Sequence, residues 1–381
     1  MSFEILRSDI SALALGSAVL GCGGGGNSYY GQLVASRALA ADSSVRVIDI
    51  EEMDARAFAL TSAAVGAPLI CLEKPPSMSA LRVGVDSAKA LLHGSVGAFF
   101  AAEIGGLQCM FPLMLAAETG LPLLDGDGMG RAFPELQMST FAIYGTTPGL
   151  PTVLSSDRGL LFDNVSAMLK YAPPPADSRD SGDVRFERAV RKICADDGGL
   201  IYLTAAFDQP SLSRTIVRGS IHLALKIGRA VESARSANTD PIAALIDAGC
   251  GKRFIGGKIV DVERHFRGGH DWGEVRLEGI DDSRARSSSR DRGRVARISF
   301  KNEYLILWLD GEVVLTVPDL ITLAETETGT PVSTEILRPG LRVTVVGLPC
   351  SPLLRSPAAL RAVGPRAFGY DLEYVSIDRI D

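Results

Sequence analysis

Three carboxylates stand directly after short apolar runs of the sequence. Glu103 closes the run AFFAAEIGG, and Asp125 and Asp127 close LPLLDGDGMGR. In open α/β sheets, ligands bind at the carboxyl ends of strands. A carboxylate held there by a glycine-rich loop can bind a metal ion or act as a general base. Asp-Gly pairs are also common turn formers, so turn formation alone is the competing interpretation.

Two arginines and one histidine could complete such a site. Arg131 follows the Asp-Gly loop, and Arg366 lies in VGPRAFGYD near the end of the sequence. A guanidinium group can bind a substrate carboxylate, although packing of its stem on the surface explains Arg366 equally well. His222 lies in a helical segment and could supply a nitrogen ligand, while a packed or capping histidine is the alternative. The sequence contains no H-E-x-x-H or G-x-S-x-G motif.

The stretch LGCGGGGNSYYG has five glycines in the six positions from Gly21 to Gly26. Glycine loses more backbone freedom on folding than other residues, so such a run calls for a reason. Helical patterns precede and follow it, which predicts two helices joined by a turn of positive φ. Backbone N–H groups in a turn of this kind can bind an anion. We expect this role for Gly23, Gly24, Gly25 and Gly26, with Asn27 or Ser28 capping the second helix.

Other interpretations of the glycine turn remain open. It could be a flexible linker, a close packing of two helices, or a lipoprotein cleavage site before Cys22. Cleavage requires a basic N-terminal segment, whereas Glu4 and Asp9 outnumber Arg7 there. A dinucleotide site needs a strand before its glycines, and a P-loop needs Lys-Ser/Thr after them, so neither is predicted. Cys22 is either a reactive helix-terminal thiol or a small apolar filler.

The composition is that of an ordinary globular protein. The 381 residues are 46 % hydrophobic and 22 % charged, with a net charge of −6. The acidic balance favours neither nucleic acid nor an anionic membrane surface as a partner. No apolar run reaches the length of a membrane span. The six cysteines are scattered and no signal peptide is evident, so we expect reduced thiols and a cytoplasmic location.

Apolar runs alternate with helical patterns in the first half of the chain. The patterns predict strands at 45–50, 58–66 and 96–106, and helices at 77–92 and 107–120. This βαβ rhythm is typical of a mostly parallel sheet covered by helices. We therefore expect an α/β N-terminal domain with a mostly parallel sheet, followed by a mixed α+β C-terminal domain rich in antiparallel β-structure. The expected bounds are 1–170 for the first domain, 171–183 for a Pro/Ser/Asp-rich linker and 184–381 for the second domain.

Seven segments in this order resemble the DUF917 family, also called the S-methyl-thiohydantoin desulfurase-like proteins. They are LGCGGGGNSYYG, EIGGLQ, DGDGMGRAFPELQM, TIVRGSIHLALKIGRA, GKIVDVER, GEVVLTVPDLI and VGPRAFGYD. The match runs from about residue 8 to about residue 375, which is nearly the whole chain. The resemblance implies two domains and a genomic neighbourhood of hydantoinase/oxoprolinase-type enzymes. It also implies a metal-dependent hydrolase, with a divalent metal such as zinc (Zn2+), that removes sulfur from a thiohydantoin. Cys22 is not part of the matching motif.

These observations lead to a hypothesis of a metal-assisted hydrolase for a small-molecule substrate, a cyclic ureide or thioureide such as hydantoin or thiohydantoin. Glu103 and Asp127 are the predicted catalytic residues. The predicted metal ligands are Asp125, Asp127 and His222, and the predicted substrate-binding residues are Gly23 to Gly26, Asn27, Arg131 and Arg366. We expect the glycine turn to lie close to the DGDGMGR loop. The alternative is a non-catalytic subunit of a hydantoinase/oxoprolinase-type complex, and either a homo-oligomer or a hydantoinase-type partner is compatible with the sequence.

Overall fold

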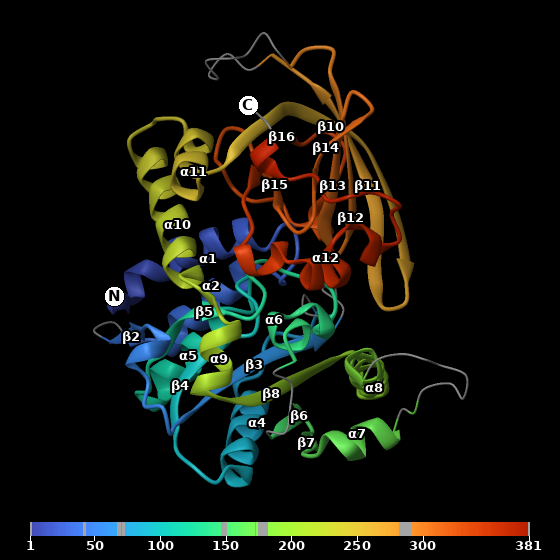
Figure 1. Cartoon of the computed structure of the whole chain (residues 1–381). Coiled ribbons are helices and arrows are strands. Elements are labelled where there is room, and N and C mark those ends of the chain that lie inside the picture. The colour runs from blue at the N-terminus through green and yellow to red at the C-terminus, as the bar shows by residue number, and fades with distance from the viewer. Residues whose placement is uncertain are drawn as a thin grey trace.

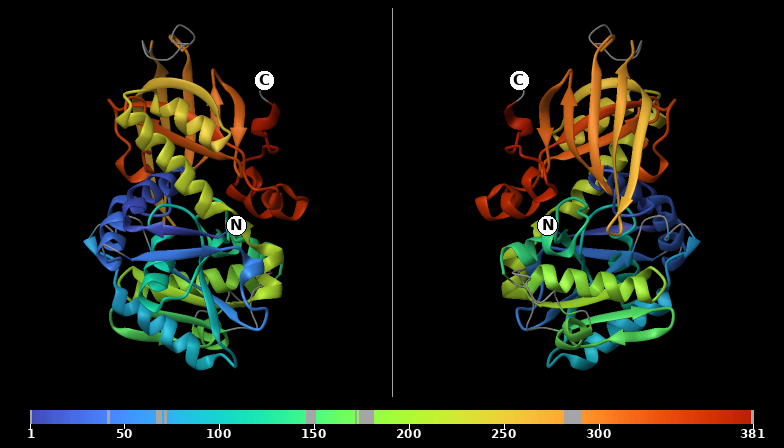
Figure 2. Two further views of the ribbon diagram at one scale, coloured as in Figure 1. Left: turned by 90° about the vertical axis from the view of Figure 1, so that its left-hand side faces the viewer. Right: turned by 90° about the vertical axis from the view of Figure 1, so that its right-hand side faces the viewer.

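The chain forms two stacked lobes, each built on one β-sheet (Figures 1 and 2). The computed structural model describes residues 2–40, 43–66, 70, 73–145, 151–171, 173, 182–281 and 291–379. Most of the predicted linker at 171–183 lies outside these residues. The lobe drawn at the bottom of Figure 1 contains the first sheet, and the lobe at the top contains the second.

The first sheet contains nine strands within the described residues. In spatial order they are β1 (Phe3–Leu6), β2 (Ser44–Ile48), β5 (Leu123–Asp127), β4 (Val96–Ala101), β3 (Phe58–Gly66), β8 (Leu200–Asp208), β6 (Thr152–Ser156) and β7 (Gly159–Phe162), with β9 (Val217–Arg218) paired to β5. The central strands β2, β5, β4 and β3 are mutually parallel, and the outer pairs are antiparallel. The predicted α/β class with a parallel core is confirmed.

Helices cover both faces of this sheet because its central strands are apolar on both sides. Phe99 of β4 faces a core shared with α4 and α5, whereas the next residue, Phe100, faces a core shared with α8 and α9. Strands buried on both faces are read from the sequence as continuous apolar runs. The α-helices among the described residues are α1 (Ile10–Leu20), α2 (Ser28–Ala38), α4 (Met78–Leu91), α5 (Met110–Thr119), α6 (Thr140–Ile143), α7 (Val165–Tyr171), α8 (Gly182–Asp196), α9 (Gln209–Thr215), α10 (Ser220–Ser236), α11 (Pro241–Gly249) and α12 (Pro357–Val363).

Strand β8 follows the predicted linker in the sequence but belongs to the first sheet. It pairs with β3 along its whole length, from Phe58 opposite Asp208 to Gly66 opposite Leu200, and with β6 on its other side. Eight of its nine residues are buried. Its apolar side chains are thus shielded from water on both faces of the sheet. The first sheet therefore includes chain from both sides of the linker, and the second sheet begins only after α11.

The second sheet is antiparallel throughout, as predicted for the second half of the chain. Its strands in spatial order are β14 (Glu312–Thr316), β13 (Glu303–Leu309), β12 (Val295–Lys301), β11 (His270–Gly279), β10 (Lys252–Arg267), β16 (Arg342–Leu348) and β15 (Leu320–Glu325). Helix α10 runs from the first sheet toward the second and crosses α1 (Figure 1). The crossing is close, since a Cβ added to Gly16 would lie 1.7 Å from the carbonyl oxygen of Ala224.

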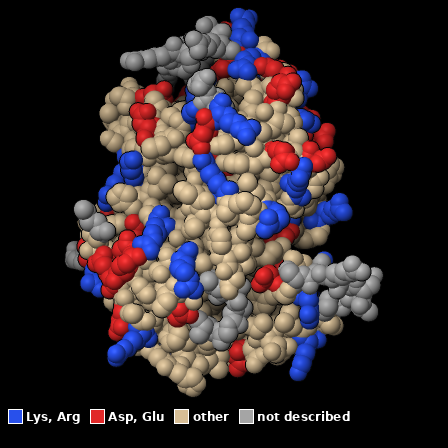
Figure 3. All heavy atoms as spheres, viewed as in Figure 1, with Lys and Arg blue, Asp and Glu red and all other residues tan. Residues whose placement is uncertain are grey.

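The surface and the helices carry two further observations. On the face shown in Figure 3, lysine and arginine side chains are interspersed with aspartate and glutamate. Within the residues that the structure describes, none of the helices combines the length and the apolar character that crossing a membrane requires.

Candidate active site between the two sheets

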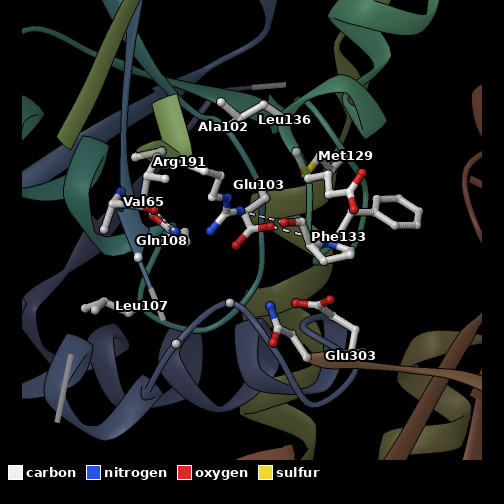
Figure 4. Close-up of a pocket in the computed structure, with 18 residues that line it drawn as sticks. Val65, Ala102, Glu103, Leu107, Gln108, Met129, Phe133, Leu136, Arg191 and Glu303 are labelled. Atoms are coloured by element: carbon white, nitrogen blue, oxygen red, sulfur yellow. Dashed lines mark hydrogen bonds between the residues drawn. The ribbon is translucent and has the colours of Figure 1, made fainter. Parts of the chain in front are cut away.

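A cavity of about 100 Å³, here called the acid cavity, lies where the first sheet meets the second (Figure 4). Neighbouring parallel strands end here, as expected for a ligand site in an open sheet. The walls come from the ends of β3 and β4, the loop after β5, the glycine turn, α8 and the β12–β13 turn. The residues that matter below are Gly25, Gly26, Glu103, Gln108, Met129, Phe133, Glu135, Arg191 and Glu303. Because Met129 belongs to DGDGMGR, the expected proximity of that loop to the glycine turn is confirmed.

Glu103 points into the middle of the acid cavity (Figure 4). Only 7 % of this residue is exposed, and its carboxyl accepts a hydrogen bond from the Phe133 N–H at 3.3 Å. Burial, with a further contribution from the charge of Asp127, raises the pKa of Glu103 to about 8, although Phe133 and Arg191 act in the opposite direction. A carboxyl that titrates near neutral pH can both take and give a proton at physiological pH.

Glu303 enters the same cavity from the second sheet. The preceding residue, Asn302, has a left-handed backbone (φ 59°) and forms the turn between β12 and β13. Asp271 holds this turn, since its N–H donates to Asn302 Oδ1 at 2.9 Å and its carbonyl accepts from the Asn302 N–H at 2.8 Å. Left-handed backbone is tolerated by asparagine better than by most residues. The turn thereby places a carboxyl at the start of β13, facing the first sheet.

The two carboxyls influence one another. Glu303 is 4 % exposed, and its Oε2 has no hydrogen-bond partner within the described residues. Burial first, and then the nearby charge of Glu103, raises the pKa of Glu303 well above its usual value. Two carboxyls that share a buried site do not both ionise readily. Near neutral pH the cavity therefore holds at least one protonated carboxyl.

Fixed charges flank this pair. Arg191 donates from Nε to Glu187 Oε1 at 2.6 Å and from Nη2 to the Pro134 carbonyl at 2.7 Å. Within the described residues its Nη1 makes no hydrogen bond, and the side chain lines the cavity beside Glu103 (Figure 4). Glu135 is paired with Lys301, and this pairing lowers the pKa of Glu135 against the opposing effect of burial. Arg191 is therefore a positioned cation with hydrogen-bonding capacity left for a ligand.

The glycine turn is explained first by close packing. Gly25 has φ +79°, and a Cβ there would lie 2.4 Å from the Gly105 carbonyl carbon. A Cβ on Gly24 would lie 2.1 Å from Glu303 Oε1. The Gly25 carbonyl accepts from the Leu107 N–H at 2.9 Å, while the N–H groups of Gly25 and Gly26 have no partner within the described residues. Both residues line the acid cavity, so their binding of an anion stays a prediction that the geometry allows.

Gly23 and Asn27 have structural partners instead. The Gly23 carbonyl accepts from the Thr334 N–H at 2.9 Å and so joins the turn to the second sheet. The Asn27 side chain accepts from the Tyr30 N–H at 3.1 Å and caps α2, as the sequence predicted. Neither residue lines the acid cavity, and Gly24 meets it only through its contact with Glu303. The substrate-binding role expected for these three residues therefore has no support in the cavity's geometry.

Asp127 organises the loop that carries the cavity. Its Oδ2 accepts from the N–H groups of Ile104 at 2.9 Å, Met129 at 3.0 Å and Gly130 at 2.8 Å. Burial raises its pKa to about 6, against the opposing effect of these N–H groups. Since Asp127 fastens the segment after β4 to the segment after β5, it holds Glu103 and Met129 in register. It does not itself line the cavity.

Arg131 differs most from its expected role in substrate binding. It is wholly buried, and its guanidinium donates to the carbonyls of Tyr304 at 2.8 Å and Asp319 at 2.9 Å. A third hydrogen bond goes to its neighbour Ala132 at 3.1 Å. All three nitrogens are thus engaged with backbone, because a buried guanidinium requires partners. Arg131 joins the two sheets rather than facing the cavity.

The remaining predicted residues lie away from the acid cavity. Asp125 Oδ1 accepts from the backbone N–H of His222 at 3.0 Å, and the His222 ring packs edge-on against Phe3 with 5.6 Å between ring centroids. Arg366 is exposed and pairs with Glu373 at 2.6 Å. None of these residues is brought together with Glu103. Asp125 instead lies within β5 and caps the start of α10, a role that neither the metal-ligand nor the turn-forming interpretation described.

The predicted metal ligands do not form a metal site. Asp125 Oδ1 and Asp127 Oδ2 accept from backbone N–H groups, while Asp127 Oδ1 is buried without a partner among the described residues. Within the described part of the chain, no three His, Cys, Asp or Glu side chains group as metal ligands. Cys22 is wholly buried, and burial raises its pKa to about 11. Its thiol is therefore protonated at neutral pH, which favours the apolar-filler interpretation.

Sequence reasoning did not single out Glu303 or Arg191, two of the charged residues of this cavity. Glu303 had a signal, since Asn302-Glu303 interrupts two apolar strand patterns and a charge begins the run EYLILWL. Arg191 had no such signal in the sequence, because it is one of several arginines on the amphipathic helix α8 and no local pattern sets it apart. Only the packing of α8 against the strand ends identifies it.

The fold and this acidic cavity define a two-sheet α/β protein with a paired-carboxyl site at the lobe interface. The model of the S-Me-THD-like N-terminal domain matches residues 8–162, and that of the S-Me-THD-like C-terminal domain matches residues 181–377. The chain belongs to the S-Me-THD-like family, as the sequence resemblance implied. A crystal structure of a protein from Chromobacterium violaceum shares the fold, with a TM-score of 0.76 and 24 % identity over 99 % of this chain and 100 % of that one. No curated protein matches the chain in sequence.

Proposed function

We propose that the acid cavity is the active site of a hydrolase for a small cyclic thioureide or ureide, such as a thiohydantoin or a hydantoin. Membership of the S-Me-THD-like family supports the substrate class. The observation that carries the chemistry is the pair of buried carboxyls, Glu103 and Glu303, which face one cavity from two different sheets. Paired carboxyls of raised pKa are typical of general acid–base catalysis.

The roles follow from the protonation states. In its ionised form, whose share grows as the pH rises toward its pKa of about 8, Glu103 takes a proton from a water that attacks the sulfur-bearing or carbonyl carbon of the ring. The carbon–oxygen bond forms first and gives a tetrahedral adduct that carries one hydroxyl. When the adduct collapses, either the carbon–nitrogen bond breaks and the hydroxyl becomes part of a carboxyl group, or the carbon–sulfur bond breaks and the hydroxyl gives its proton to solvent as the new C=O forms. Burial and the nearby charge of Glu103 raise the pKa of Glu303 well above its usual value, and Glu303 in its protonated form gives its proton to the departing sulfur or nitrogen. After the step Glu103 holds a proton and Glu303 has lost one. Exchange with solvent returns a proton to Glu303 and removes one from Glu103 before the next turnover.

Negative charge that develops on the substrate meets three groups at the wall of the cavity. The N–H groups of Gly25 and Gly26 and the Nη1 of Arg191 have no partner within the described residues. Donors fixed before the reaction stabilise developing charge more than mobile water does. Arg191 is fixed by Glu187 and the Pro134 carbonyl, which supports this assignment.

A divalent metal, expected from the resemblance, remains a separate proposal. Glu103 and Glu303 are the carboxyls best placed to share an ion, and Glu303 Oε2 is buried without a partner in the described part of the chain. Elemental analysis of the purified protein tests this. A stoichiometric divalent ion that is lost in Glu303→Gln would identify Glu103 and Glu303 as metal ligands. Full turnover by metal-free protein would instead support their roles as general acid and base without a metal.

The test of function is turnover of thiohydantoins and hydantoins, measured as released thiol or sulfide and as ring opening. Glu103→Gln and Glu303→Gln should each lower kcat by roughly 10²–10⁴-fold, the usual range for losing a general acid or base. Glu312→Gln, at an exposed position in the second sheet, is the matched control and should keep full activity. Wild-type turnover in Glu303→Gln would overturn the proposed mechanism.

A further inference from the structure

A second cavity, of about 350 Å³ and here called the apolar cavity, adjoins the acid cavity. Ala102, Met129 and Leu136 line both. Binding pockets for small ligands usually measure about 300–1,000 Å³. The acid cavity, at about 100 Å³, has room for roughly three waters at about 30 Å³ each. It can hold a reacting group, but most of a larger ligand needs the adjoining space.

The apolar cavity is lined by aromatic and aliphatic side chains. It lies between the face of β8 and helices α7 and α8, and its apolar wall includes Phe141, Phe186, Phe207, Val165, Leu169 and Leu203. Phe141 and Phe207 lie 4.6 Å apart between ring centroids. Aromatic walls favour a flat ring that can stack or pack edge-on. The volume and the lining thus suit a ring-bearing apolar group.

Two polar atoms in this wall point to a specific feature of the ligand. Thr61 is 3 % exposed, and its Oγ1 has no hydrogen-bond partner within the described residues. Gln137 Oε1 is likewise buried and unpartnered in that part of the chain. Both residues line the apolar cavity. Buried polar atoms are nearly always paired. The Gln137 oxygen can only accept, and the Thr61 hydroxyl can accept as well as donate, so together they indicate a ligand that brings a hydrogen-bond donor.

We infer that the apolar cavity binds a ring-bearing apolar substituent of the substrate that carries one hydrogen-bond donor. The cyclic thioureide or ureide to which it is attached then reaches Glu103 and Glu303 through the boundary formed by Ala102, Met129 and Leu136. The identity of the reacting ring rests on the proposed function. The assignment of the substituent rests on the apolar cavity itself, so binding can test it without turnover.

The experiment measures the Kd of four probes by calorimetry on the full-length protein. The probes are hydantoin, 5-methylhydantoin, 5-benzylhydantoin and 5-(4-hydroxybenzyl)hydantoin. Burial of a phenyl ring should make the benzyl compound bind roughly tenfold or more tightly than the methyl compound. The hydroxyl should add roughly a further fivefold by donating to Thr61 or Gln137. Equal Kd values for the methyl and benzyl probes would overturn the inference.

Two variants locate the binding. Ala205→Leu narrows the apolar cavity from β8, so it should weaken the benzyl probe roughly tenfold and leave hydantoin unchanged. Thr61→Val keeps the shape and removes an unpaired buried hydroxyl, so folding should be preserved and the preference for the hydroxybenzyl probe should shrink. If Thr61→Val leaves that preference intact and Ala205→Leu weakens all probes equally, the assignment fails. Selective binding without turnover supports the assignment while it refutes the proposed hydrolase.

Discussion

The pH dependence of stability offers a direct test of the buried state of Glu103. The Glu103 carboxyl has a usual pKa of 4.5, and burial raises it to about 8 in the folded protein. Between these values the folded state holds a proton that the unfolded state has lost. Stability from this group is therefore fully present below pH 4.5 and is lost as the pH rises through 8. Each pKa unit corresponds to about 1.4 kcal/mol, so the loss between pH 5 and pH 8 is about 4 kcal/mol.

Glu103→Gln removes this titration, since an amide does not ionise but still accepts from the Phe133 N–H. The free energy of unfolding of Glu103→Gln, relative to the wild type, should rise by about 4 kcal/mol from pH 5 to pH 8 and change little above that. Urea unfolding of both proteins in the same buffers at pH 5, 7 and 9 measures the difference. Glu312→Gln is the control for the loss of an exposed carboxyl. A difference that stays constant from pH 5 to pH 9 would refute a buried, protonated Glu103.

Two further predictions concern the glycine turn and the fixed cation. Gly25→Ala should destabilise the protein by about 3 kcal/mol or more in thermal or urea unfolding, because its Cβ would clash with Gly105 at 2.4 Å as well as strain the backbone. Gly311→Ala, at φ +92° with nothing within 4 Å of the added Cβ, should cost only the strain of about 1–2 kcal/mol. Equal losses in the two variants would contradict the packing explanation. Arg191→Met keeps the stem but removes the charge, and it should lower kcat/KM by roughly 10²-fold. Arg158→Met changes a largely exposed arginine and should leave kcat/KM unchanged. Unchanged kinetics in Arg191→Met would show that Arg191 is not part of the site.

The local elements of the first sheet could be predicted from the sequence with good accuracy. The strand predicted at 58–66 appears as β3, and the helix predicted at 77–92 appears as α4. Hydrophobic periodicity and helix capping depend on residues only a few positions apart, so both can be recognised directly in the sequence. The same local rules placed Glu103 at a strand end and therefore in the cavity. They also identified the glycine turn as an exceptional backbone.

What each turn residue does was decided only by tertiary packing. Sequence could not show that Gly25 presses against Gly105, or that Gly24 makes room for a carboxyl 279 positions along the chain. Nor could it show that the guanidinium of Arg131 would donate its hydrogen bonds to the backbone carbonyls of Tyr304 and Asp319. Side-chain type limits what a residue can bind, but the available partners are set by which elements meet.

The acid pair shows this division most clearly. Glu103 was predictable because the end of an apolar strand is a local feature, whereas its partner Glu303 comes from a turn in another sheet. The raised pKa of each carboxyl depends on burial and on the nearness of other charges, and both are properties of the assembled lobes. The sequence alone determined which strand ends carry acids. The folded structure decided which acids are buried together. This shared burial raises their pKa values, and raised pKa values are what proton transfer near neutral pH requires.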